Sequence, residues 1–330
     1  MSVKGCEVLY TIGDAILVDT TLEQLAERFM PLWDLYYFED DHIYRYLLDA
    51  GIPVYTRAEF SRSFPRFSLD YGALYQMFDL SIPDVPWVTL LRTAQWWALG
   101  SKLQVELMEY QIRCGRGNIY EGSWFSKDDC PVNNTVTVNG RWCYLLTAED
   151  WQAKGTDDRK QWVLKWLVQW HTGAPLSIRV GSIGGFERVP YRLIHEYAGT
   201  FAHQSGPNCF AAAIAMVVGG SGVDYYPQSR DLITQWLHQE PFFRLLDAQR
   251  YQKVIELRTI DPVMVQPADV LIWCTSDGAA KHAAFAITPD AVFQKEGQGW
   301  ESPWLLVQLN RVRYNEYLKS GGHVAVYRRQ

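Results

Sequence analysis

The last third of the chain shows the most regular pattern of hydrophobic and polar positions. Residues 209–218 carry only small or apolar side chains, which predicts a helix that is buried on all sides. Residues 270–274, 282–287 and 291–294 are short, mostly apolar runs of strand length, separated by polar and Pro-Asp turns. We therefore expect a helix packed against an antiparallel sheet of about five strands.

Apolar positions in the first half of the chain recur mainly at helical intervals. Their spacing predicts a helix over residues 22–35 and a long helix over 88–113. Trp162, Trp166 and Trp170 recur every four residues, which predicts a helix with one buried aromatic face. The expected fold class is α+β, with a mainly helical, aromatic-rich N-terminal region over residues 1–195 and a second domain over 196–330.

Composition and charge limit the classes of function. The chain of 330 residues is 48% hydrophobic and 21% charged, as in a globular protein of about two domains. Its formal charge is −6 and it lacks a basic face, so no nucleic-acid partner is expected. No apolar run reaches the length of about 18 residues that a membrane span needs, and the N-terminus has no signal-peptide pattern. We therefore expect a cytoplasmic protein, with its oligomeric state left open.

The six cysteines are spread along the chain, and no two are closer than 13 residues. This spacing contains no Cys-x-x-Cys pair, so it matches neither a zinc site nor a dense disulfide framework. Cys130 and Cys143 flank a hairpin predicted by Asn139-Gly140 and could meet across it, but a reducing compartment would keep both as thiols. No metal and no organic cofactor are expected.

Cys209 is the best candidate for a nucleophile, because it begins the predicted buried helix. Gly206, Pro207 and Asn208 before it are turn residues, which places the cysteine in the first helical turn. The N-terminus of a helix carries about half a positive charge, which stabilises a thiolate and lowers the pKa of a cysteine there. Free backbone N–H groups at the same place can receive an oxyanion that forms beside the sulfur.

His282 is the candidate base for this cysteine. It opens the second predicted strand, and Gln294 lies twelve residues later on the next strand. In an antiparallel hairpin these two positions are neighbours, so Gln294 can orient the imidazole ring. His323, at the start of the last predicted strand, is an alternative base.

Three residues just before the nucleophile are candidates for binding the oxyanion or the substrate: His203, Gln204 and Asn208. A side chain at Gln204 either donates to the oxyanion or caps a turn, and a ring at His203 lies near enough in sequence to bind substrate. Lys295 and Glu296, which follow Gln294, are expected to face solvent.

The order of these segments resembles the NlpC-type cysteine peptidases and amidases of the papain-like superfamily. The resemblance covers residues 204–298 and includes a Cys at a helix start, a Pro-x-Asp strand, a His strand and a polar residue one strand further on. It implies a papain-like domain in which Cys209, His282 and Gln294 form the catalytic set and Gln204 donates to the oxyanion.

The sequence departs from the pattern of that family at three places. The usual Asp-Cys-Ser-Gly at the nucleophile is replaced by residues 208–211, Asn-Cys-Phe-Ala. Ala268 stands where the usual Pro-Gly-Asp turn has Gly, and Gln294 stands where a His is common. The change around the nucleophile is compatible with the chemistry, but it puts a peptidoglycan substrate in doubt.

The expected function is cleavage of an amide bond, in a peptide or other amide-containing substrate, through a thioester on Cys209. Two alternatives remain open at this point. One is an acyltransferase or transglutaminase-like enzyme with the same Cys-His pair. The other is a non-catalytic binding or scaffold protein that retains the fold, which the long region 1–195 and the unusual nucleophile sequence both favour.

Overall fold

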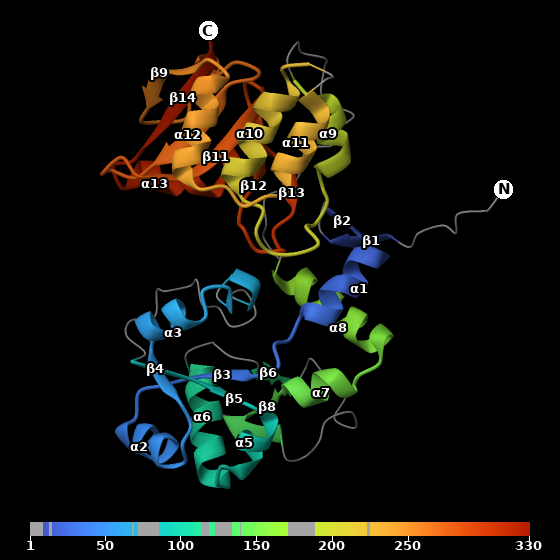
Figure 1. The fold of residues 1–330 in the computed structure, drawn as a ribbon, viewed down its shortest axis with the longest axis vertical. Coiled ribbons are helices and arrows are strands. Elements are labelled where there is room, and N and C mark those ends of the chain that lie inside the picture. The colour runs from blue at the N-terminus through green and yellow to red at the C-terminus, as the bar shows by residue number, and fades with distance from the viewer. Residues whose placement is uncertain are drawn as a thin grey trace, which may run out of the picture. The chain divides into compact units, whose positions relative to one another are not determined.

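The computed structural model describes residues 9–12, 15–67, 69–71, 86–113, 119–122, 134–138, 140–170, 189–222 and 225–330. Contacts group the chain into two compact units, one of Met1–Gln24 with Leu164–Gln330 and one of Leu25–Val163. We call them the C-terminal unit and the central unit, and Figure 1 labels their elements. The chain crosses between the units at residues 24–25 and 163–164, whereas the sequence predicts a single boundary near residue 195.

The C-terminal unit is built around a six-stranded antiparallel sheet with the strand order β13-β12-β11-β10-β14-β9. Its strands are β9 (Tyr251–Leu257), β10 (Val270–Cys274), β11 (Ala280–Thr288), β12 (Ala291–Lys295), β13 (Trp304–Gln308) and β14 (His323–Arg329). A separate antiparallel pair in this unit consists of β1 (Leu9–Ile12) and β2 (Ala15–Val18). Antiparallel pairing in every sheet of the described residues agrees with the predicted α+β class.

Helices cover one face of the six-stranded sheet and short helical turns cover the other. Figure 1 shows three helices side by side on one face, namely α10 (Cys209–Gly219), α11 (Tyr226–Ile233) and α12 (Gln239–Ala248). The unit also contains α9 (Tyr191–Tyr197), η6 (Pro262–Met264), η7 (Leu309–Arg311), η8 (Arg313–Asn315) and α13 (Glu316–Lys319). Leu309, Tyr314 and Leu318 pack on the second face, beside Trp273. The small side chains of α10 let this helix lie close to the sheet, and it is buried on all sides as predicted.

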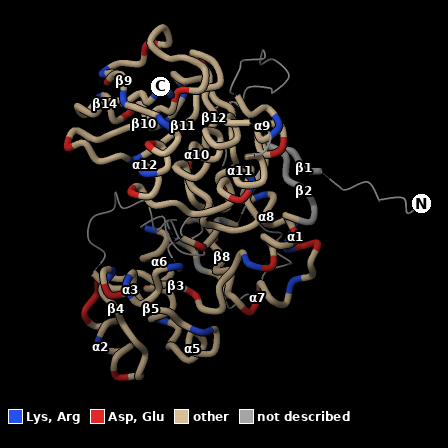
Figure 2. The backbone as a smooth tube through the Cα atoms, turned by 45° about the horizontal axis from the view of Figure 1, so that its top comes forward, with Lys and Arg blue, Asp and Glu red and all other residues tan. Residues whose placement is uncertain are grey.

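The central unit contains two three-stranded antiparallel sheets, with the orders β3-β5-β4 and β6-β8-β7. Its strands are β3 (Asp34–Phe38), β4 (Val54–Thr56), β5 (Trp87–Leu91), β6 (Ile119–Glu121), β7 (Thr135–Val138) and β8 (Arg141–Leu145). The helices over residues 19–170 are α1 (Asp19–Arg28), α2 (Asp41–Asp49), α3 (Arg57–Ser63), α5 (Thr93–Ala98), α6 (Ser101–Arg113), α7 (Ala148–Ala153) and α8 (Thr156–Trp170). Figure 2 shows Lys and Arg positions interspersed with Asp and Glu positions over both units.

Two of the helices predicted from apolar spacing are wrong in part. The helix predicted over 22–35 ends at Arg28, and Leu35 belongs to the buried strand β3, which begins at Asp34. The helix predicted over 88–113 is strand β5 followed by α5 and α6. The run in β5 is rich in aromatic, β-branched and other apolar residues, and β5 pairs with both β3 and β4. Pairing with strands distant in sequence outweighs the local spacing of apolar residues. The pattern of a single sequence does not show such pairing.

Other sequence predictions are confirmed. Helix α10 begins at Cys209, and β10, β11 and β12 coincide with the three predicted runs to within two residues at each end. In α8 the side chains of Trp162 and Trp166 are buried, and β7 and β8 form the predicted hairpin with Gly140 at φ 73°. Cys130 and Asn139 lie outside the described residues. Within the part of the chain that the structure describes, none of the helices combines the length and apolarity needed to cross a bilayer.

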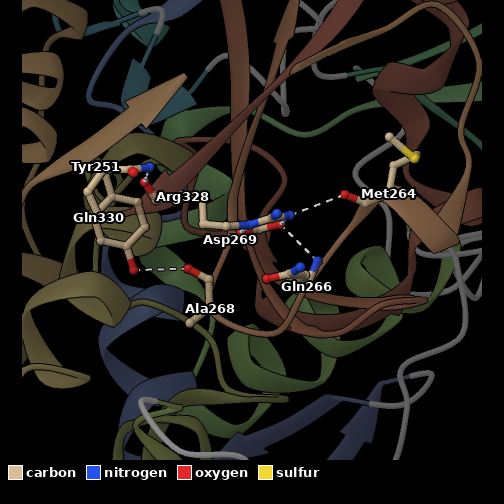
Figure 3. Close-up of polar contacts among 7 residues, drawn as sticks. All are labelled: Tyr251, Met264, Gln266, Ala268, Asp269, Arg328 and Gln330. Carbon is tan, nitrogen blue, oxygen red and sulfur yellow. Dashed lines mark hydrogen bonds and ion pairs between the residues drawn. The ribbon is translucent and has the colours of Figure 1, made fainter. Parts of the chain in front are cut away.

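A buried carboxylate fixes the turn that leads into β10 (Figure 3). Asp269 is 1% exposed; its side chain accepts hydrogen bonds from Nε and Nη2 of Arg328 at 2.8 and 2.7 Å and from the backbone N–H of Gln266 at 2.8 Å. Ala268 has φ 72°, a conformation that favours glycine, and the Tyr251 hydroxyl donates to its carbonyl oxygen at 2.9 Å. The turn thereby connects the start of β10 to β14 and β9.

Replacing Asp269 by Ala is expected to lower the free energy of unfolding by about 3 kcal/mol, because it leaves the half-buried guanidinium of Arg328 without its partner. Urea unfolding at pH 7 measures the loss. The control is Glu240→Ala, which removes an exposed pair with Arg244 on α12 and should cost less than about 1 kcal/mol. Equal losses in the two variants would contradict the assigned role of Asp269.

Candidate functional site

Cys209 is the first residue of α10, and Asn208 caps the helix. Asn208 Oδ1 accepts the N–H of Ala211 at 3.0 Å and that of Leu237 at 3.4 Å, while Nδ2 donates to the Leu237 carbonyl at 2.8 Å. Both ends of this amide therefore hold the start of α10 to the segment that precedes α12. Gly206, in the turn before the cap, has φ 143°, which a residue with a Cβ rarely adopts.

The surroundings of the Cys209 sulfur favour the thiol over the thiolate. Cys209 is 9% exposed, and burial raises the pKa of its thiol to about 11. The backbone N–H groups of Ala283, Phe210 and Cys209 and the charge of Lys295 lower this pKa by smaller amounts. The expectation of an anionic sulfur at rest is therefore wrong, because the loss of hydration outweighs the field of the helix.

His282 and Gln294 lie together, as their twelve-residue spacing predicts. His282 Nε2 is 2.8 Å from Gln294 Oε1, and both side chains are almost completely buried. A carbonyl oxygen only accepts, so Nε2 carries the ring proton and Nδ1 keeps its lone pair. Neither His282 Nδ1 nor Gln294 Nε2 has a hydrogen-bond partner among the described residues. Burial lowers the pKa of His282 to about 4, against the effect of the Gln294 hydrogen bond, so the ring is neutral at pH 7.

Strands β11 and β12 are not paired at the level of this site. Their register runs from Phe285 opposite Phe293 to the turn, and His282 and Gln294 lie beyond the paired region. The N–H of Ala283 lies close enough to the Cys209 sulfur to lower its pKa. No hydrogen bond joins the sulfur to the His282 ring among the described residues; the two are connected through Ala283, the residue next to the histidine.

Two aromatic residues hold the His282 ring, and sequence reasoning assigned neither of them to the site. Tyr314 of η8 stacks on the ring with centroids 4.1 Å apart and an interplanar angle of 6°. Trp273, which pairs with His282 across β10 and β11, lies 5.4 Å away between centroids. The Tyr314 hydroxyl donates to the carbonyl oxygen of Glu296 at 3.0 Å, and burial raises its pKa. These contacts fix the orientation of the ring.

Lys295 is buried, so the expectation that it faces solvent is wrong. Its Nζ donates to the carbonyl oxygens of Gly297, Gly299 and Ser302 at 2.8, 2.8 and 2.7 Å. Burial lowers the pKa of Lys295 to about 7, while the nearby Glu301 carboxylate opposes the shift. Alternation along β12 predicts that Lys295 points away from its neighbour Gln294, and its charge indeed acts on the sulfur of Cys209.

The remaining candidates are Gln204, His203 and His323, and the two histidines contact groups other than Cys209. Gln204 and His203 are exposed, and His203 Nδ1 is 3.2 Å from the hydroxyl of Thr21. Their predicted roles with substrate or oxyanion stay predictions. His323 lies opposite Cys274 in β14, two strands from β11, with Nε2 3.8 Å from Glu256. His323, the alternative base, therefore lies beside Cys274 and Glu256 and not beside Gln294.

The described residues contain no group of three or more His, Cys, Asp or Glu side chains placed to hold a metal ion. The chemistry that the described side chains offer is thus a thiol, a neutral imidazole with one free lone pair, and an amide that holds the other ring nitrogen. Compared with known proteins, the chain matches no family model, no curated protein and no solved structure.

Proposed function

We propose that the C-terminal unit is a papain-like cysteine hydrolase of NlpC type, which cleaves an amide bond in a peptide or other amide-containing substrate. The observation that supports this most is the buried pair of His282 and Gln294, in which one ring nitrogen is held and the other is unpartnered. An unpaired buried polar atom costs free energy and calls for an explanation beyond packing. A base for the thiol of the adjoining helix supplies that explanation.

In the proposed reaction, the Cys209 sulfur attacks the carbonyl carbon of the amide while His282 Nδ1 takes the thiol proton. The backbone N–H of Cys209, together with Gln204, stabilises the oxyanion. The amine leaves with the proton from His282, which forms a thioester on Cys209. Water then loses a proton to the same nitrogen and attacks the thioester, which releases the acid and restores the thiol. Since thiol and ring are both neutral at rest, the proton moves during the attack and not before it.

Acyl transfer to an amine or hydroxyl is a second candidate, and the burial of the site favours it. His282 is fully buried and Cys209 nearly so, which keeps water away from a thioester. Product analysis with and without an added amine separates the two reactions, because only transfer yields a new amide.

The test of the proposal is the rate at which each cysteine of the native protein reacts with iodoacetamide at pH 7. Cys209 is expected to react at least about tenfold faster than Cys274, because a neighbouring base assists removal of its proton. Solvent exposure does not account for such a difference in rate, because Cys209 and Cys274 are 9% and 6% exposed. His282→Gln, which keeps a donor for Gln294 but removes the base, is expected to slow Cys209 at least about tenfold. Peptide mass spectrometry gives the rates.

The matched control is His195→Gln, at an exposed histidine in α9, which should leave the reactivity of Cys209 unchanged. If Cys209 reacts no faster than Cys274, or if His282→Gln does not slow it, the unit is a non-catalytic binding or scaffold protein that keeps the fold.

A further inference from the structure

Lys295 is a buried cation whose three N–H donors are all used by one short loop. The carbonyl groups that accept from it belong to residues 297–302, which we call the lysine-held loop. The same loop is closed internally by the N–H of Gly297, which donates to Ser302 Oγ at 2.9 Å. An ammonium has three N–H donors, and here each of them has a carbonyl acceptor. The lysine therefore orders the loop and has no donor left for water.

The lysine-held loop is joined in turn to the segment that leads into the nucleophile. The N–H of Gly206 donates to the Gln298 carbonyl at 2.8 Å, and the N–H of Trp300 donates to Ser205 Oγ at 3.1 Å. Ser205 and Gly206 precede Asn208 by three and two residues, so the loop supports the turn from which α10 starts.

Charged and aromatic groups face the Lys295 ammonium from several elements. The Trp304 ring of β13 lies 5.5 Å from Nζ, the Glu301 carboxylate lies near enough to raise the lysine pKa, and the Cys209 sulfur does the same from α10. A Cβ on Gly299 would collide with the Glu301 carboxylate, so glycine there leaves room for this acidic group. The three carbonyl acceptors hold the ammonium in place, and the Glu301 carboxylate and the Cys209 sulfur both act on it electrostatically.

We propose that Lys295 is a positioning residue of the Cys209 site, which fixes the turn before the nucleophile through the lysine-held loop. This role rests on the proposed function for its use in catalysis. The loop contacts can be tested independently of any substrate.

The experiment combines the rate of Cys209 alkylation by iodoacetamide with amide hydrogen exchange, both in the native protein at pH 7. Lys295→Met keeps the length of the side chain but removes its donors. It is expected to increase hydrogen exchange at the amides of Gly206 and Trp300 and to slow Cys209 about tenfold, while Cys274 reacts as before, because the turn before α10 is no longer fixed. Lys319→Met, at an exposed lysine of α13, should change neither quantity.

A second variant tests the link between the loop and the turn. Ser205→Ala removes the acceptor of the Trp300 N–H and leaves Lys295 unaltered. It should increase hydrogen exchange at the amides of Gly206 and Trp300 and slow Cys209 but not Cys274. This variant also decides the proposal if Lys295→Met does not fold.

The proposal is overturned if Lys295→Met leaves exchange and rate unchanged, if Lys319→Met changes them equally, or if Ser205→Ala leaves both unchanged. The His282→Gln variant, measured in parallel, keeps the two proposals apart. Faster exchange and slower alkylation with Lys295→Met but no effect of His282→Gln would reject the hydrolase and retain the role of Lys295 in fixing the turn. The reverse pattern would reject the role of Lys295 alone.

Discussion

Replacing Asp34 by Asn is expected to stabilise the central unit at neutral pH, and the gain relative to wild type should grow by about 4 kcal/mol between pH 4 and pH 7. Asp34 begins β3 and is 1% exposed, and neither of its carboxylate oxygens has a hydrogen-bond partner among the described residues. Burial raises the pKa of this carboxyl to about 8; the nearby N–H of Ala148 lowers it in part, and the charge of Asp150 raises it further.

The sign of the effect follows from proton binding in the two states. The folded protein keeps the Asp34 proton up to about pH 8, whereas the unfolded chain releases it near its ordinary pKa of 3.8. Between these values the unfolded state is stabilised by ionisation, so the free energy of unfolding falls as the pH rises. An asparagine does not ionise, and the comparison across pH cancels the cost of burying its amide.

Urea unfolding followed by amide exchange and mass spectrometry on peptides of β3 and β5 reports on the central unit alone. The matched control is Asp157→Asn, at an exposed carboxylate of α8, which should not reproduce the gain of about 4 kcal/mol between pH 4 and pH 7. A constant difference for Asp34→Asn would show that the Asp34 carboxyl ionises normally in the folded protein.

Acidification should weaken the C-terminal unit through His282, by about 3 kcal/mol between pH 7.5 and pH 4. Burial lowers the pKa of this ring to about 4, while the unfolded chain takes up a proton near 6.5. The unfolded state therefore binds more protons in this window, and stability is lost as the pH falls below 6.5. Above that pH the ring is neutral in both states and the effect vanishes.

The measurement for this second prediction is the difference between wild type and His282→Gln at the two pH values. Because glutamine carries no titrating proton, the variant should lack about 3 kcal/mol of the acid-induced loss, as read from exchange at the amides of α10. His195→Gln on the surface should retain the whole loss. If His282→Gln and wild type weaken in parallel, His282 takes up its proton in the folded state as readily as in the unfolded chain.

Helix α10 and strands β10, β11 and β12 of the C-terminal unit were predictable because their signals are local. Residues 209–218 are apolar without a break, and turn residues bound each of the three strands, so spacing alone marks where they begin and end. That His282 and Gln294 lie close to one another was predictable for the same reason, since a short turn joins their strands.

What could not be predicted depends on residues distant in sequence. Strand β5 was mistaken for helix because its stability comes from pairing with both β3 and β4. Tyr314 reaches the His282 ring from η8, and Lys295 is buried only because a later loop folds over it. The pKa of Cys209 was misjudged in direction, because the helix N-terminus is visible in a sequence and the degree of burial is not.

The strand order of the six-stranded sheet bears on how the protein is made. β14 lies between β10 and β9, although it is the last of the six to leave the ribosome. Until residues 323–329 have emerged, β9 has no partner in this sheet and one side of β10 is an open edge, a template for pairing with other nascent chains. We expect ribosome-bound chains that stop before residue 323 to bind chaperones. This binding should end once β14 has emerged and can pair with β10 and β9.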